Sequence, residues 1–208
     1  MALLTTFNPA SAIAKPLRIL ALGTSLTQGY NLPPGTDFTA VLESRLKSAG
    51  YDVAVVNAGV SGDTSADGLA RLDWALAEPY DAAIVEFGSN DALRGLAVSD
   101  MQANVDAVIT KLKAKGLAVL LTGMKAPRNM GKDYAAAFDA VYPALAKKQD
   151  VLFYPFFLDG VAADLSLNQA DGIHPNEKGT QVIVTRMLPF VEKLIAQVKA
   201  KPAASTSN

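Results

Sequence analysis

The sequence has no cysteine and only one histidine among its 208 residues. The absence of cysteine excludes disulfides, thiolate nucleophiles, iron–sulfur clusters and cysteine-ligated zinc. An excess of charge of one sign is lacking too: the formal net charge is -1, and charged residues make up 19% of the chain. Such a surface does not attract phosphate backbones or anionic lipid, so we expect no nucleic-acid partner. No apolar run approaches the roughly 20 residues that span a bilayer, so we expect no transmembrane segment.

The two ends of the chain differ in composition from the part between them. Residues 1–14 finish with Ala12-Ile13-Ala14, an A-x-A pattern typical of the end of a secretory signal, although no Lys or Arg precedes Lys15. We therefore expect a leader or signal-peptide remnant at 1–14 and a periplasmic or secreted protein, with a cytoplasmic location as the alternative. Residues 201–208 are mostly small and polar, which predicts a disordered tail. Residues 15–200 are expected to form a single domain, because a chain of this length with 50% hydrophobic residues can bury one compact core.

Short aliphatic runs alternate with amphipathic segments of helical period along the chain. The runs lack the polar alternation of half-exposed strands, so they predict strands buried on both faces, at residues 17–22, 53–56, 82–87, 118–122 and 151–154. The helical segments lie at about 37–49, 64–76, 99–115, 134–147 and 176–199. This alternation predicts a parallel sheet with helices on both faces, a three-layer, doubly wound α/β sandwich. We expect a five-stranded, flavodoxin-like sheet with the strand order 2-1-3-4-5.

Catalytic residues are expected in the loops after the strands, because ligands of such sheets bind at the carboxyl ends of the strands. The loop after the first strand holds Ser25 at a glycine-containing turn, where a hydroxyl can be held above the sheet. A serine that caps a helix is the structural alternative for this position. Ser25 is therefore a candidate nucleophile that needs a base.

His174 is the candidate base, since no other histidine is present. Asp171 lies three residues earlier, near enough to accept a hydrogen bond from one ring nitrogen and leave the other free to take a proton from a serine. Such a carboxylate fixes the tautomer and stabilises the imidazolium that forms during attack. A surface or cap histidine is the alternative, but the presence of Asp171 favours the base.

Two further residues could stabilise an oxyanion at the same edge of the sheet. Gly62, in the loop after the second strand, can bring a bare backbone N–H close to a substrate. Asn90, after the third strand, offers a side-chain amide. As alternatives, Gly62 could serve only a turn with positive φ, and Asn90 and Asp91 could cap a following helical turn.

Taken together, these segments resemble the SGNH (GDSL-like) hydrolase family, and within it the branch of thioesterase I, arylesterase and lysophospholipase. The family blocks GDSL(S/T), SGDT, G-x-ND and D-G-x-H-P correspond in order and spacing to the segments at 23–27, 61–64, 88–91 and 171–175. The resemblance extends from about residue 17 to 199. It implies Ser25 as the nucleophile, an Asp171-His174 pair, and an oxyanion hole formed by the N–H groups of Ser25 and Gly62 and the side chain of Asn90.

One position departs from the family block, which normally has Asp before the nucleophile where this chain has Thr24. A carboxylate there would accept hydrogen bonds more strongly than a hydroxyl does. The other expected site residues are complete, so we expect activity to be altered and not abolished. On this argument, Thr24→Asp is expected to raise kcat on aryl esters.

The resemblance implies a serine esterase that forms an acyl-enzyme and needs no cofactor or metal. Its expected substrate is a small-molecule ester, with aryl or short-to-medium acyl groups, and thioesters and lysophospholipids are further candidates. Several apolar residues are candidates either for an acyl groove or for the core: Leu93, Leu96, Val98, Met124, Met130 and Phe157.

Other functions fit parts of the sequence. An acyltransferase would use the same acyl-enzyme with an alcohol acceptor. A flavodoxin-like binding module would cradle phosphate after the first strand, but no G-x-G-x-x-G or P-loop motif follows that strand, and the module leaves Asp171 and His174 without a role. An α/β-hydrolase would need a G-x-S-x-G match, which is absent. A metal site could be built from Asp63, Asp67 and Asp91, although such acids are more often caps.

Overall fold

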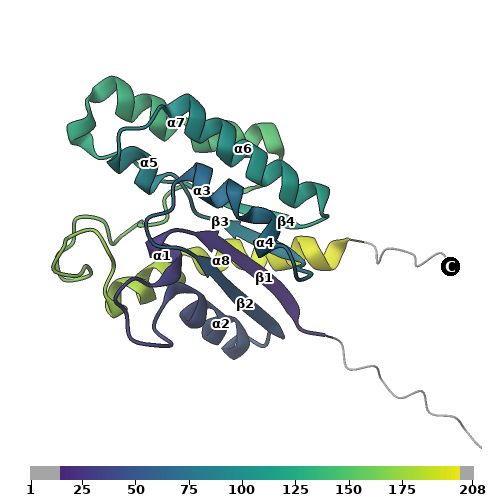
Figure 1. Cartoon of the computed structure of the whole chain (residues 1–208). Coiled ribbons are helices and arrows are strands. Elements are labelled where there is room, and N and C mark those ends of the chain that lie inside the picture. The colour runs from purple at the N-terminus through teal and green to yellow at the C-terminus, as the bar shows by residue number, and fades with distance from the viewer. Residues whose placement is uncertain (1–14, 202–208) are drawn as a thin grey trace, which may run out of the picture.

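Strands and helices alternate along the chain in a computed structural model that describes residues 15–201 (Figure 1). The expected leader at 1–14, the location inferred from it, and the expected tail from residue 202 onward lie outside the described residues. The strands are β1 (Leu17–Gly23), β2 (Val53–Gly59), β3 (Ala82–Val85), β4 (Ala118–Thr122) and β5 (Leu152–Tyr154). The longer helices are α2 (Phe38–Ser48), α6 (Val98–Ala114), α7 (Lys132–Gln149) and α8 (Glu177–Ala200). The short helices are α1 (Ser25–Gln28), α3 (Ser65–Ala70), α4 (Leu72–Ala75), α5 (Ser89–Leu93) and the 3-10 helix η1 (Arg128–Met130).

The strands form one parallel sheet in the order β2-β1-β3-β4-β5, which confirms the predicted topology. Helices α2 and α8 cover one face of this sheet, and α3, α6 and α7 lie on the other (Figure 1). The fold is therefore the three-layer α/β sandwich that the sequence predicts. Gly23 is paired with Gly59 where β1 and β2 end, so the loops after both strands start side by side.

The prediction that every strand is buried on both faces is wrong for the two edge strands. Residues of β1, β3 and β4 are almost all buried, whereas β2 alternates buried Val53 and Val55 with half-buried Ala54 and Val56. In β5, Leu152 and Phe153 are also half-buried. An edge strand has a neighbour on one side only, so less of its surface is covered.

The helix predicted at 64–76 is divided into α3 and α4 at Arg71. The side chain of Thr64 and that of Asp67 cap the start of α3 reciprocally. Arg71 has φ -94° and ψ 1° and ends the first piece. Its guanidinium donates to Oδ2 of Asp63 at 2.5 Å and to the carbonyl of Gly23 at 3.0 Å. These bonds tie the end of β1 to the loop after β2.

The short helices α1 and α5 have no counterpart in the sequence prediction, because segments of four or five residues show no helical period. Within the described residues, no helix is both long and apolar enough to cross a membrane.

Candidate active site

The loops that the sequence analysis singled out meet at the carboxyl ends of the strands. Ser25 opens α1 directly after β1, Gly62 follows β2, and Asn90 lies in α5 after β3. Asp171 and His174 lie in the long loop between β5 and α8. These segments gather along the left edge of the molecule in Figure 1, where the green loop approaches α1.

Ser25, His174 and Asp171 form a continuous chain of hydrogen bonds. Oγ of Ser25 lies 2.9 Å from Nε2 of His174, although 149 positions separate them in sequence. Nδ1 of His174 lies 2.7 Å from Oδ2 of Asp171. When Nδ1 donates to the carboxylate, Nε2 is free to accept the serine proton. The structure thus brings together the three residues that the sequence reasoning combined.

Asp171 remains ionised because its carboxylate is surrounded by donors. Its Oδ1 accepts the backbone N–H groups of Ile173 at 2.9 Å and His174 at 3.0 Å. The pKa of Asp171 is lowered to about 2, chiefly by the hydrogen bond from the His174 N–H. Burial opposes this shift, and the bonds from the imidazole and from the Ile173 N–H add to it. The negative charge that would stabilise an imidazolium at His174 is therefore present at any ordinary assay pH.

Ser25 is not the helix cap that the sequence offered as an alternative, because its neighbour Thr24 has that role. Thr24 is the N-cap of α1, and its hydroxyl accepts a long hydrogen bond from Leu26 N–H at 3.4 Å. Ser25 is the first helical residue, and its hydroxyl meets His174 instead. The side chain of Ser25 is consequently available for chemistry.

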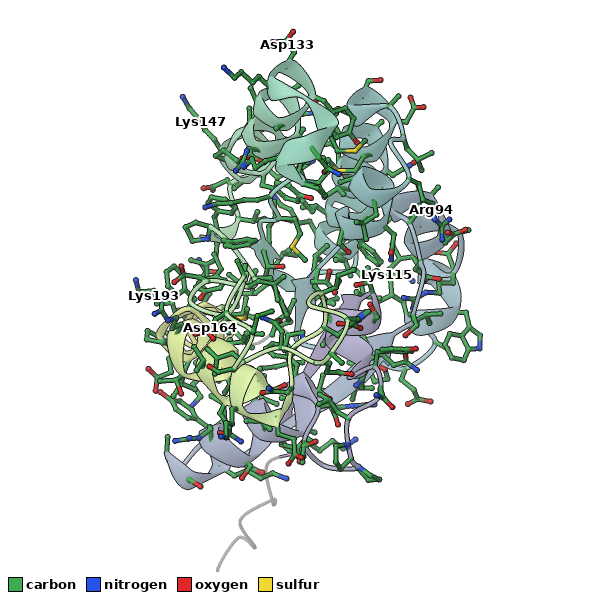
Figure 2. The ribbon with its side chains drawn as sticks, turned by 90° about the vertical axis from the view of Figure 1, so that its left-hand side faces the viewer. Arg94, Lys115, Asp133, Lys147, Asp164 and Lys193 are labelled. Atoms are coloured by element: carbon green, nitrogen blue, oxygen red, sulfur yellow. The ribbon has the colours of Figure 1, made fainter. Side chains whose placement is uncertain are left out.

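The loop that carries His174 is fastened to the loop after α1. The side chain of Gln169 donates to the carbonyls of Tyr30 at 2.8 Å and Pro175 at 3.0 Å. The backbone N–H of Gln169 donates to the carbonyl of His174 at 2.8 Å. The ring of Tyr30 lies 4.7 Å from the imidazole, centroid to centroid. Asp164, labelled in Figure 2, lies earlier in the same loop. The loop that carries the imidazole is therefore tied to Tyr30, just after α1, both by a hydrogen bond and by a contact between the two rings.

Gly62 and Asn90 lie next to each other across two loops. Nδ2 of Asn90 donates to the carbonyl of Asp63, the residue after Gly62, at 2.8 Å. The carbonyl of Gly62 accepts a hydrogen bond from Nη2 of Arg94 at 2.6 Å. Arg94, which is labelled in Figure 2, follows the last residue of α5. Gly62 has φ +85°, a backbone conformation that glycine adopts readily. The turn alone therefore explains a glycine at this position, without a role in substrate binding. One hydrogen of the Asn90 amide is engaged, and the other can still be donated.

One interpretation of the sequence was that Asp91 caps a helical turn. The structure shows no such cap at the start of α5. The carboxylate of Asp91 accepts hydrogen bonds from the N–H and the hydroxyl of Ser65, at 2.9 and 2.6 Å, and so joins α5 to the start of α3. Asp63 pairs with Arg71, and Asp67 caps α3. Within residues 15–201, no three His, Cys, Asp or Glu side chains are grouped as metal ligands. The three carboxylates suggested for a metal site are thus occupied with separate structural bonds.

A cavity of about 540 Å³ opens beside the serine and histidine. Ser25, Asn90 and His174 line it together, so the candidate nucleophile, base and amide donor face one space. Its apolar wall is formed by Leu26, Leu93, Met124, Pro127, Phe156, Leu158 and Ile173. A pocket of this size with few polar groups suits a small, largely apolar ligand.

The candidate groove residues are only partly correct. Leu93 and Met124 line the cavity, but Phe157 is 0% exposed and packs on Phe38 in the core, with ring centroids 5.1 Å apart. Its neighbour Phe156 lines the cavity instead. Leu96, Val98 and Met130 are not among the lining residues.

Glu86 is a residue near the site that sequence reasoning missed. It follows β3 and is 0% exposed. Its carboxylate accepts hydrogen bonds from the N–H of Thr24 at 2.9 Å, from the Thr24 hydroxyl at 3.0 and 3.1 Å, and from the Thr27 hydroxyl at 2.9 Å. Burial raises the pKa of Glu86 to about 7, although these donors oppose the rise. A charged residue inside the apolar run 82–87 was the signal that could have revealed it.

Glu86→Gln is expected to remove a pH dependence of folding stability. The pKa of Glu86 is higher in the folded protein than in the unfolded chain, so the protonated side chain favours folding at low pH. That contribution is fully present below about pH 4.5 and is lost as the pH rises through about 7. The free energy of unfolding of the wild type should therefore fall relative to Glu86→Gln by about 3 kcal/mol across this range. Urea unfolding of both proteins from pH 4 to 8 measures the difference, and a constant difference contradicts the prediction.

The fold and this geometry define the class of the protein, a hydrolase built on a flavodoxin-like sheet. A model of the GDSL-like lipase/acylhydrolase family matches residues 21–182. The chain belongs to this family, and it is an enzyme that acts on ester bonds.

Its relatives cover nearly the whole chain. Esterase TesA of Pseudomonas aeruginosa is 41% identical over 85% of this chain and 89% of its own length. An arylesterase of Vibrio mimicus is 33% identical over 97% of both chains. The thioesterase 1/protease 1/lysophospholipase L1 of Escherichia coli is 36% identical over 92% of this chain and 89% of its own. A crystal structure of TesA superposes with a TM-score of 0.81 at 40% identity, over 85% of this chain and 99% of that one.

Proposed function

We propose that this enzyme is a serine esterase in which Ser25 is acylated and His174, oriented by Asp171, transfers protons. The observation that carries the proposal is the hydrogen-bonded chain from Ser25 Oγ to His174 Nε2 and from His174 Nδ1 to Asp171, at 2.9 and 2.7 Å. The distance between Ser25 and His174 is short enough for direct proton transfer, and the bond to Asp171 orients the ring. A binding module would have no use for this arrangement.

The proposed reaction proceeds in two halves. As Ser25 Oγ bonds to the ester carbonyl carbon, Nε2 of His174 takes the hydroxyl proton, and the resulting imidazolium is stabilised by Asp171. The tetrahedral intermediate expels the alcohol or phenol, which receives that proton from His174. A water molecule then attacks the acyl carbon while His174 takes its proton. The second tetrahedral intermediate breaks its bond to Ser25 Oγ, which receives that proton back from His174, and the carboxylic acid is released.

The oxyanion of each tetrahedral intermediate is proposed to rest on the N–H groups of Ser25 and Gly62 and on the Asn90 amide. Asn90 lines the cavity with Ser25, and its bond to Asp63 holds the amide beside Gly62. Donors that are fixed before the reaction need no reorganisation as charge develops. The mechanism uses no cofactor or metal.

The proposed substrates are small esters with an aryl or a short-to-medium acyl group. The support is the size and apolar wall of the 540 Å³ cavity, together with the names of relatives that are an esterase, an arylesterase and a thioesterase/lysophospholipase. Thioesters and lysophospholipids belong to the same proposal, since the acyl-enzyme is shared. No contact in the described residues favours an alcohol acceptor over water.

A fluorophosphonate probe tests the acyl-enzyme, because it reacts with an activated serine at the oxyanion site. Mass spectrometry of the digested protein should find the label on the peptide that contains Ser25. Hydrolysis of p-nitrophenyl esters of graded chain length, repeated with acyl-CoA and with added alcohol, then defines the acyl and leaving groups. Labelling at Ser61 or Ser89, or ester hydrolysis without any labelling, contradicts the proposed nucleophile.

Asn90→Ala is expected to reduce kcat by about 10²–10³-fold, the usual loss for one oxyanion donor. The loss should appear in kcat with little change in KM, because the donor acts mainly on the charge that develops in the transition state. Asn104→Ala is a suitable control. Asn104 also donates a side-chain hydrogen bond near α3, to Ser65, but it does not line the cavity. Equal losses of kcat in Asn90→Ala and Asn104→Ala would mean that the Asn90 amide acts through the structure and not on the oxyanion.

A further inference from the structure

The buried carboxylate of Glu86 is bound by donors from a single short segment. The three donor groups belong to Thr24 and Thr27, which lie on either side of Ser25 and Leu26. In the described part of the chain, no Lys, Arg or His lies within ion-pair distance of Glu86. A carboxylate without a cationic partner is costly to bury. Within the described residues, the only groups that compensate the buried charge of Glu86 therefore belong to the turn that carries Ser25.

The backbone before the turn is shaped to admit this carboxylate. A Cβ on Gly23 would lie 2.6 Å from Oε2 of Glu86 and 2.1 Å from Oγ1 of Thr27. Since these are impossible contacts, any larger residue at 23 would push the carboxylate and the turn apart. Gly23 is thus needed for close approach, independently of the hydrogen bonds themselves.

Thr24 is held at each of its polar groups. Its N–H and hydroxyl donate to Glu86, and its carbonyl accepts the N–H of Gln28 at 2.9 Å. A residue held in this way cannot rotate without breaking at least two bonds. The direction of the next peptide N–H, that of Ser25, and the starting point of the Ser25 side chain are fixed as a result.

We propose that Glu86 is a positioning residue for the nucleophile, and that Thr24 transmits its effect to Ser25. This inference rests on the proposed function, in which Ser25 supplies both the attacking oxygen and an oxyanion N–H. Glu86 does not touch the substrate. It accepts the donors of residues 24–27, and the ordered turn then aims the Ser25 hydroxyl at His174.

Thr24→Val tests the connection, because valine has nearly the shape of threonine but no hydroxyl. We expect kcat on a p-nitrophenyl ester to fall on the order of 10–100-fold, as for a small misplacement of a reacting group. KM should change less than about twofold, and fluorophosphonate labelling of Ser25 should slow in parallel. Thr24→Ser keeps the hydroxyl and should retain kcat within about threefold of the wild type.

Thr122→Val is the matched control. Thr122 is 0% exposed like Thr24, and its hydroxyl also donates a buried hydrogen bond, but to the carbonyl of Val85. Thr122→Val should lower the midpoint of thermal unfolding about as much as Thr24→Val does, and it should leave kcat near the wild-type value. If Thr24→Val yields no folded protein, Thr27→Val replaces it, since Thr27 donates to the same carboxylate. The proposal is wrong if Thr24→Val, or its replacement, keeps kcat within twofold or loses no more than Thr122→Val.

A double-mutant cycle with Glu86→Gln shows whether Thr24 acts through Glu86. Glutamine leaves the helix-capping role of Thr24 intact but disturbs the acceptor of its hydroxyl. If the two act together, Thr24→Val combined with Glu86→Gln should lose little more kcat than the larger single loss. Multiplied losses overturn the connection. Ser25→Ala tests the proposed function separately. If Ser25→Ala stays active, the assignment of Ser25 as the nucleophile is wrong. If Ser25→Ala is inactive but Thr24→Val is unaffected, only the positioning role of Glu86 is refuted.

Discussion

Ser25→Ala should lower kcat/KM on a simple aryl ester by on the order of 10⁴-fold or more while the protein remains folded. The hydroxyl makes its hydrogen bond to His174 only, and the side chain is half-buried at the cavity, so its removal leaves the core intact. Oxyanion donors and substrate binding remain and account for the residual rate. Steady-state hydrolysis of p-nitrophenyl acetate, with circular dichroism to monitor folding, measures both parts of the prediction.

Ser61→Ala is the control for this substitution. Ser61 follows β2 at the same edge of the sheet, and its exposed hydroxyl contacts the side chain of Gln28, not His174. The activity of Ser61→Ala should remain within a few-fold of the wild type. Near-normal turnover by Ser25→Ala would remove Ser25 as the nucleophile, and a large loss in Ser61→Ala would move the assignment to that residue.

The parallel sheet with helices on both faces could be predicted because aliphatic runs and amphipathic segments alternate along the chain. The strand at 118–122 was placed correctly to the residue, since its five residues are all buried and uniformly apolar or threonine. Burial at the sheet edges could not be predicted. A run such as 53–56 has the composition of a central strand, and only the assembled sheet shows that β2 has one neighbour.

The candidate site was predictable because its polar residues follow strands that end at one edge. Ser25, Asn90 and His174 face one cavity for this reason. The wall of the cavity was harder to predict, since a periodic pattern does not distinguish Phe156 from Phe157 in a loop. Phe157 belongs to the core, and Phe156 lines the cavity. Side-chain direction in an irregular segment depends on tertiary contacts that no local pattern encodes.

Thr24 has a role in the structure that the family pattern does not indicate. The expected gain from Thr24→Asp assumed that residue 24 acts as an acceptor. Its hydroxyl does accept from Leu26 N–H, but it also donates to Glu86, at 3.0 and 3.1 Å. An ionised Asp cannot donate, and beside Glu86 it would place two carboxylates together, which requires them to share a proton. The structural argument for a higher kcat is thereby lost.

Asp171→Asn should lower kcat by roughly 10⁴-fold without disturbing the loop. The Oδ1 atom of asparagine can still accept the N–H groups of Ile173 and His174, at the positions now 2.9 and 3.0 Å away. The amide nitrogen that replaces Oδ2 is a donor, so Nδ1 of the imidazole must become an acceptor. The ring proton then lies on Nε2, facing Ser25, and the base can no longer take the serine proton.

Asp164→Asn provides a matched control for Asp171→Asn on the same loop. Oδ1 of Asp164 accepts the N–H of Ser166, two residues later, at 2.9 Å, just as Oδ1 of Asp171 accepts that of Ile173. The chemical change and the local turn are therefore the same, but no histidine is involved. Asp164→Asn should keep kcat within about twofold of the wild type. If Asp171→Asn lost less than tenfold, or if both variants lost activity alike, the carboxylate would serve only to shape the loop, and the tautomer argument for His174 would fail.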